Sequence, residues 1–117
     1  MPYMLLMIEA PEQRSTRTEA QGHAVYDRMV GFADALKERG LLLAVQSLQG
    51  QQRATRVRVR DGKPQVIDGP FAEAKEMVGG FFLIDCPREQ ALQIARECPA
   101  VEWATVELRE TGPCFAG

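Results

Sequence analysis

The sequence lacks the features of a disulfide-stabilised, membrane-spanning or nucleic-acid-binding protein. Only three of its 117 residues are cysteine, none in a Cys-x-x-Cys pair, so neither a disulfide framework nor a metal site is indicated. No apolar run approaches the roughly 20 residues that cross a bilayer. The net charge is −2, which gives no general attraction to nucleic acid or anionic membranes. Histidine and tryptophan each occur once.

The three cysteines are interpreted as reduced thiols. Cys86 and Cys98 flank a predicted helix, and at about 1.5 Å per residue they lie roughly 18 Å apart, beyond disulfide reach. Cys114 follows Gly112-Pro113 in a short tail. The N-terminal apolar stretch has no basic segment, so it predicts a strand rather than a signal peptide. We expect a cytoplasmic protein with no metal and no cofactor.

What the sequence does contain is the pattern of one α+β domain, residues 1–117. With 45% hydrophobic residues, a chain of this length can build one core. Apolar segments predict strands at residues 3–8, 41–48, 81–84 and 101–108. A helix is predicted from Thr18 to Arg39, capped by Thr18 with Gln21 or by Thr16 with Glu19.

Periodic apolar residues define the inner faces of two helices. The first helix has a stripe at a spacing of four, three and four: Val25, Met29, Phe32 and Leu36. Pro87 opens the second helix and Pro99 stops it. Its predicted inner face comprises Ala91, Leu92, Ile94, Ala95 and Cys98.

A β-hairpin is predicted between the second and third of these strands. Within residues 54–60, Thr55, Val57 and Val59 alternate with three arginines at 56, 58 and 60. Asp61-Gly62 is a strong turn signal, and residues 65–67 form the returning strand. Without this hairpin the order is strand, helix, strand, strand, helix, strand, the ferredoxin-like split βαβ arrangement with both helices on one face. The other face would be bare, with some of Phe81, Phe82, Tyr3 and Leu5 exposed, so we expect a homodimer.

The stretch VIDGPFAEAKEMVGGFFLID connects the hairpin to the most apolar strand. Asp68-Gly69-Pro70 predicts a sharp turn, with Asp68 at a strand end. Residues 72–77 favour helix by composition but are too short to form one alone. Gly79-Gly80 ends this connector.

This stretch resembles a known family signature. DGPFAEAKE followed by GGFFLID is similar to the DGPF family, a branch of the YCII-related proteins. The likeness covers roughly the whole chain, through MPYMLLMIE, LKERGLL, RVRVRDG and ARECPAVEWATVELRE. It implies a dimeric α+β barrel. It also implies a histidine on the first helix near an aspartate, as an acid/base site with isomerase- or lyase-like chemistry.

His23 and Asp68 are the residues that match this acid/base pair. His23 lies off the buried face of its helix, beside Tyr26, so it is either a solvent-exposed histidine or part of a pocket. The resemblance, rather than the spacing, brings it near Asp68. Asp68 would then orient the imidazole, and His23 would transfer a proton. Alternatively, Asp68 caps its own turn.

Other candidate residues also have two interpretations. Phe71 and Tyr26 are candidate substrate-binding residues, and Lys75 either binds an anionic group or pairs with Glu76. The arginines of the hairpin indicate a solvated strand face rather than a nucleic-acid site, because no aromatic residues interleave with them. Trp103 is expected at the dimer interface or in a pocket wall.

Two functions follow as hypotheses. The first is a dimeric protein with a His23/Asp68 pocket acting on a small organic molecule. The second is a non-catalytic accessory or regulatory protein with a protein partner, since DGPF proteins are linked to extracytoplasmic-function sigma factors. No DNA-reading motif supports direct contact with nucleic acid.

Overall fold

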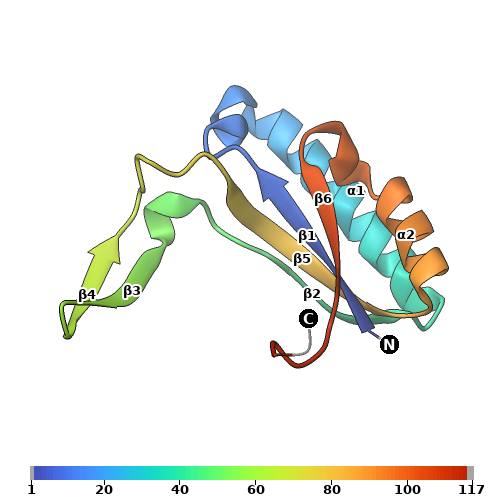
Figure 1. The fold of residues 1–117 in the computed structure, drawn as a ribbon. Helices are drawn as coiled ribbons and strands as arrows, with labels where there is room; N and C mark the ends of the chain where they lie inside the picture. Colours follow the sequence, from blue (N-terminus) through green and yellow to red (C-terminus); the bar gives the residue numbers. More distant parts are fainter. Residues whose placement is uncertain (1, 116–117) are drawn as a thin grey trace.

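The main sheet has four antiparallel strands in the order β2-β5-β1-β6, with two helices on one face (Figure 1). The computed structural model describes residues 2–115. Its strands and helices, in chain order, are β1 (Pro2–Glu9), α1 (Glu19–Glu38), β2 (Leu42–Ser47), β3 (Thr55–Arg60), β4 (Lys63–Asp68), β5 (Met77–Asp85), α2 (Arg88–Glu97) and β6 (Thr105–Glu110). This is the predicted ferredoxin-like α+β arrangement, with the β3–β4 hairpin as a separate two-stranded sheet.

Alternation along β1 separates the two faces of the sheet. Tyr3, Leu5 and Met7 are buried beneath the helices, whereas Met4 and Leu6 between them are only half-buried. Because Leu5 pairs with Phe82 and Tyr3 with Ile84, β5 follows the same phase. The core lies between this face and the helices, centred on Leu5, Ile84, Leu36, Ile94 and Cys98.

The open face was expected to include some of Phe81, Phe82, Tyr3 and Leu5, and one of these four residues lies there. Tyr3, Leu5 and Phe82 point toward the helices, and Phe81 alone of the four candidates lies on the other face. The register of β1 against β5 decides this, since a shift of one residue would exchange the faces.

Helix α1 begins with the predicted capping box. The Thr18 hydroxyl accepts a hydrogen bond from the backbone N–H of Gln21 at 3.1 Å, and the Gln21 side chain accepts one from the backbone N–H of Thr18 at 2.9 Å. Of the predicted stripe only Leu36 is buried, while Val25 and Met29 are half-buried. The first half of α1 therefore does not pack closely on the sheet.

The second half of the chain differs from prediction at two places. Leu92 lies outside the inner face of α2 and is 36% exposed, whereas Ala91 and Ile94 are buried as expected. The predicted strand from Val101 begins only at Thr105, because Pro99–Glu102 form a 3-10 turn. Proline at the start of that turn fixes a helical φ and so delays the strand.

The β3–β4 hairpin, residues 55–68 and here called the arm, projects away from the helices (Figure 1). Its base is fixed by Gly69, whose N–H donates to the carbonyl of Ala54 at 2.8 Å. A Cβ on Gly69 would lie 1.9 Å from the backbone oxygen of Gln51, so close approach explains this glycine. The Gly69–Pro70 peptide is cis. Residues 72–76 form turns and bends rather than a helix.

Two further features concern membrane spans and cysteines. Neither helix in the described residues is long and apolar enough to cross a membrane. Cys86, Cys98 and Cys114 are free thiols, the first two buried and the third exposed.

Candidate functional site

A cavity of about 950 Å³ lies between α1 and the helix-facing side of the sheet. We call it the α1 cavity. Its sheet side includes Met7, Val45 and Phe82, and its helix side includes Val25 and Met29. The largely apolar wall and this volume suit a small organic molecule.

The double glycine of β5, Gly79-Gly80, lies in the lining of the cavity. Gly80 pairs with Met7, in the same helix-facing phase as Phe82 and Ile84. A Cβ at Gly80 would lie 2.8 Å from the backbone oxygen of Gln46, so this glycine allows the close approach of β2 to β5 beside the cavity.

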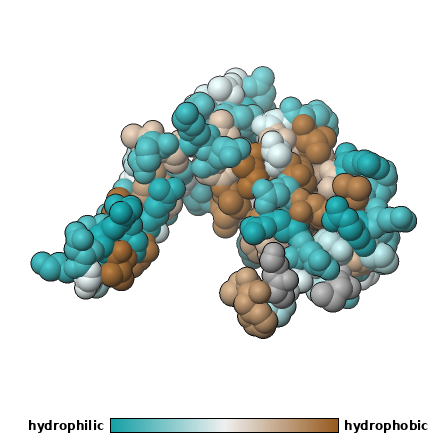
Figure 2. Space-filling view, in the orientation of Figure 1, coloured by the Kyte–Doolittle hydropathy of each residue, from teal (hydrophilic) through white to brown (hydrophobic). Residues whose placement is uncertain are grey.

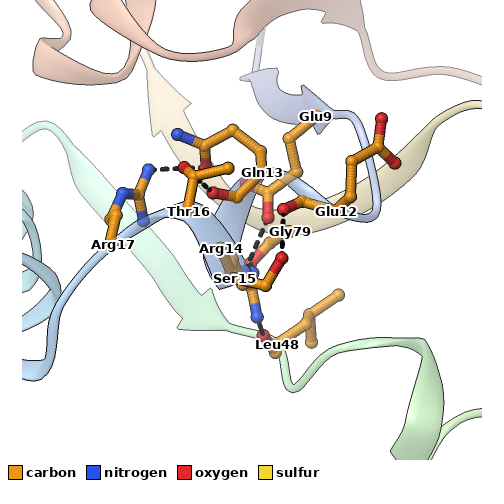
Figure 3. Close-up of polar contacts among 9 residues, drawn as sticks. All are labelled: Glu9, Glu12, Gln13, Arg14, Ser15, Thr16, Arg17, Leu48 and Gly79. Carbon is orange, nitrogen blue, oxygen red and sulfur yellow. Dashed lines mark hydrogen bonds and ion pairs between the residues drawn. The ribbon is translucent and has the colours of Figure 1, made fainter.

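The lining of the cavity includes an ion pair between Glu9 and Arg14, in which the carboxylate is buried. Figure 3 shows the polar contacts of this pair. The Glu9 side chain is 6% exposed, and its Oε1 accepts a hydrogen bond from Arg14 Nε at 2.6 Å. Arg14 also donates to the backbone carbonyls of Leu48 at 2.7 Å and Gly79 at 3.1 Å. One guanidinium thus ties the ends of β1 and β5 to the residue after β2.

Gly79 is required beside this ion pair. The pairing of β1 with β5 shifts between Met7 and Ile8, so Gly79 is the extra residue of a β-bulge. A Cβ at this position would lie 2.5 Å from Glu9 Oε2 and 2.8 Å from Arg14 Nη2. Absence of a side chain at Gly79 therefore makes room for the carboxylate and the guanidinium.

Trp103 lies in the cavity wall, which is one of the two locations predicted for it. Two arginines lie over its ring. The guanidinium carbons of Arg17 and Arg28 lie 5.4 and 5.6 Å from the ring centroid. Arg28 is paired with both carboxylate oxygens of Glu102, at 3.1 and 2.5 Å. This hydrogen bonding and the arginine's charge lower the pKa of the Glu102 carboxyl. Arg17 lines the cavity, whereas Arg28 does not.

His23 and Tyr26 line the mouth of the α1 cavity, on the exposed flank of the helix. The imidazole is 75% exposed, and its Nε2 lies 3.8 Å from Glu19 Oε1, one helical turn earlier. Tyr26 is 56% exposed. Both interpretations of His23 thus have support: it is solvent-exposed, and it borders a cavity.

The structure does not bring Asp68 to His23 within one chain. Asp68 ends β4 at the base of the arm, where Oδ1 accepts a hydrogen bond from the Thr55 hydroxyl at 3.0 Å. It does not line the α1 cavity. Its observed contact is with the opposite strand, which supports the turn and hairpin role for this residue.

Phe71 and Lys75 also lie away from the α1 cavity. Phe71 is 7% exposed and lines a smaller cavity of about 540 Å³, where the arm joins the sheet. The guanidinium carbon of Arg56 lies 3.9 Å from the centroid of its ring. Lys75 is exposed and lines neither cavity.

Sequence reasoning missed Glu9, Arg14 and Arg17. One signal for Glu9 was available: it shares the odd-numbered phase of the buried residues Tyr3, Leu5 and Met7. A carboxylate in that phase needs a buried partner. No pattern in the polar loop indicated that Arg14, rather than Arg17, would be this partner.

The chain is similar to a known protein family and to a bacterial protein. The family model described as "YCII-related domain" matches residues 1–113. An uncharacterized protein of Rhizobium meliloti (strain 1021) is 44% identical over 61 residues, which are 51% of this chain and 49% of that protein. The alignment thus spans about half the length of this relative.

Proposed function

The chain belongs to the YCII-related family, and we propose that it binds a small organic molecule in the α1 cavity, where His23 exchanges a proton with it. One observation carries this proposal: the sole histidine of the sequence borders a cavity of about 950 Å³ with apolar walls. Such a cavity can hold a drug-sized molecule, and histidine is the side chain that most readily changes charge near neutral pH.

Glu19 supports this assignment better than Asp68 does. The Glu19 carboxylate is one turn from His23, at 3.8 Å, and can stabilise the imidazolium when it forms. Asp68 is hydrogen-bonded to Thr55 at the base of the arm. The proposal therefore assigns the proton transfer to His23, with Glu19 beside it and Asp68 as a comparison residue.

The test is an NMR screen of small carboxylic acids, lactones and their neutral analogues. Molecules that bind in the cavity should shift the indole signal of Trp103 and the ring signals of His23 together. For a molecule that is converted, His23→Gln should lower the rate by about 100-fold or more and leave binding nearly intact. Asp68→Asn should change neither.

The same screen separates the second hypothesis. Molecules that bind without conversion would support a non-catalytic regulatory protein whose ligand occupies the same cavity. Binding that shifts neither Trp103 nor His23 would contradict the proposed site.

We also propose a cytoplasmic homodimer in which a second copy covers the open face of the sheet. Buried free thiols fit a reducing compartment. The open face carries a half-buried apolar centre on β1 and β5, formed by Met4, Leu6, Ile8, Phe81 and Leu83, and is bordered on β6 by Glu107 and Arg109. Such a face on a soluble protein indicates a contact surface.

Sedimentation velocity tests the dimer. Leu6→Arg, at the centre of the open face, should give monomers, whereas Leu92→Arg on the outer side of α2 should not. A wild-type monomer, or a dimer unaffected by Leu6→Arg, would contradict this interface.

A further inference from the structure

We propose that the α1 cavity takes an anionic organic molecule, a carboxylate with an apolar body, and that Arg17 binds its anionic group. This inference rests on the proposed function and adds the class of ligand. It depends on the difference between the two arginines of the cavity wall and on the contacts that hold Arg17.

Arg14 and Arg17 both line the cavity, but only one is neutralised. Arg14 binds the Glu9 carboxylate and two backbone carbonyls. Arg17 donates one hydrogen bond, to the neutral side chain of Gln13 at 2.6 Å. Within residues 2–115, Arg17 forms no ion pair. Its charge is therefore available to a ligand.

The position of Arg17 is fixed. Its guanidinium lies over the ring of Trp103, which limits its rotation, and its side chain is partly buried. It directly precedes the N-cap residue Thr18, where the dipole of α1 also favours negative charge. A guanidinium held in place presents its remaining N–H groups in the fork that matches a carboxylate.

The rest of the cavity suits the body of such a molecule. Met7, Val45 and Phe82 form an apolar surface on the sheet, and Met29 faces them from α1. A carboxylate on Arg17 would lie in the same cavity as His23, so the proposed acid/base residue and the anion would share one ligand.

The experiment compares matched probes: phenylacetate, benzoate and hexanoate, each with its neutral amide. Affinities are measured by titration of the Trp103 indole signal in the full chain. The acids should bind more tightly than the amides, and Arg17→Gln should weaken acid binding by roughly 10- to 100-fold. Binding of the amides should stay the same.

Arg28→Gln is the control. Arg28 also contacts Trp103, but it is paired with Glu102 and does not line the cavity, so acid affinity should change by less than about 3-fold. Equal binding of acids and amides, or equal losses in the two variants, would overturn the anion site and leave the proposed function intact. If no probe bound at millimolar concentration, both would fail.

A second, independent observation concerns the arm, and we infer that it clasps the second copy in the proposed homodimer. One face of the arm is apolar, because Val57 pairs with Val66 and Val59 with Pro64. The three valines are 70%, 68% and 68% exposed. Figure 2 shows apolar residues, in brown, on one side of the arm. The opposite face carries Arg56, Arg58, Arg60 and Lys63.

The arm cannot be stable on its own contacts alone. All six residues of β3 are exposed, and in β4 only Ile67 is half-buried. An isolated two-stranded hairpin is marginal in water, and an exposed valine surface adds nothing to its stability. Another surface must cover it.

Charge and position favour a second copy. The arm, residues 55–68, holds four basic and two acidic side chains, a net charge of +2. Because the whole chain carries −2, its other residues together carry −4. The arm also extends on the side of the sheet that the helices leave open (Figure 1). A partner seated on the open face would place its acidic surface against the basic arm.

The test replaces Val57, Val59 and Val66 together by threonine, which keeps the strand propensity and removes the apolar surface. The dimer dissociation constant from sedimentation should rise by about 10-fold or more, whereas Leu92→Thr on α2 should leave it unchanged. Hydrogen exchange gives a second readout: arm amides should be protected in the dimer and lose protection on dilution.

Two results would overturn the clasp. One is an unchanged dissociation constant in the triple variant. The other is arm amides that exchange rapidly at every concentration. A dimer that Leu6→Arg disrupts while the arm variant does not would retain the proposed interface and reject the arm's part in it.

Discussion

Replacing Arg14 with alanine should destabilise the fold by about 3 kcal/mol, because it leaves a buried carboxylate without its partner. The Glu9 side chain is 6% exposed and receives its hydrogen bond from Arg14 at 2.6 Å. Removing one member of a buried pair costs about 3–5 kcal/mol. The Arg14 side chain is 33% exposed, so water reaches it and the lower end of that range applies.

The measurement is urea unfolding at fixed protein concentration, followed by fluorescence of Trp103, the only tryptophan. In a parallel thermal melt, a loss of about 3 kcal/mol should lower the melting temperature by roughly 12 °C for a domain of this size. A double-mutant cycle with Glu9→Gln isolates the pair, and the double variant should be more stable than Arg14→Ala alone.

Arg28→Ala is the matched control, since its partner Glu102 is exposed. It should change stability much less than Arg14→Ala. If Arg14→Ala cost less than about 1 kcal/mol, or if the two variants behaved alike, the reasoning from burial would be refuted.

Further predictions concern a glycine and the thiols. Gly79→Ala should destabilise the fold by about 1–3 kcal/mol in urea unfolding, because the new Cβ would lie 2.5 Å from Glu9 Oε2. Gly31→Ala is the control and should be neutral or stabilising, because Gly31 lies in open space on α1. If the two variants changed stability by similar amounts, the predicted clash at Gly79 would be refuted. Burial raises the pKa of the Cys98 thiol, so the folded chain keeps a proton that the unfolded chain loses near about pH 8.5. The contribution of this thiol to stability should therefore be complete below about pH 8.5 and should be lost as the pH rises. Urea unfolding of Cys98→Ala should show a shallower fall of stability with pH. Iodoacetamide should label the exposed Cys114 in the native protein and Cys98 only on unfolding; native labelling of Cys98 would contradict its burial.

The fold was predictable from sequence because its determinants are local. Apolar periodicity fixed the order of strands and helices, and Thr18 with Gln21 fixed the start of α1. The face of each strand that would be buried depends on register, which is a relation between distant residues. For that reason the sequence could only narrow the open face to four candidates, of which Phe81 lies there.

The candidate site was predictable only in part. His23 was singled out because it is the sole histidine, and the structure places it at a cavity. Its pairing with Asp68 came from family likeness, and within one chain Asp68 contacts Thr55 instead. Arg14 was missed because its bonds to Leu48 and Gly79 span 34 and 65 residues, and no local pattern records such contacts.

The double glycine links the stability of this fold to its proposed function. Gly80 allows β2 to approach β5 beside the cavity, because a Cβ there would lie 2.8 Å from the backbone oxygen of Gln46. Gly79 makes room for the Glu9–Arg14 pair, which joins three segments of the sheet through one guanidinium. Apolar packing is thus replaced at this end of the core by one ion pair and an open cavity. Packing alone would favour filling that space, so its retention beside His23 and Arg17 supports a ligand as the reason for it.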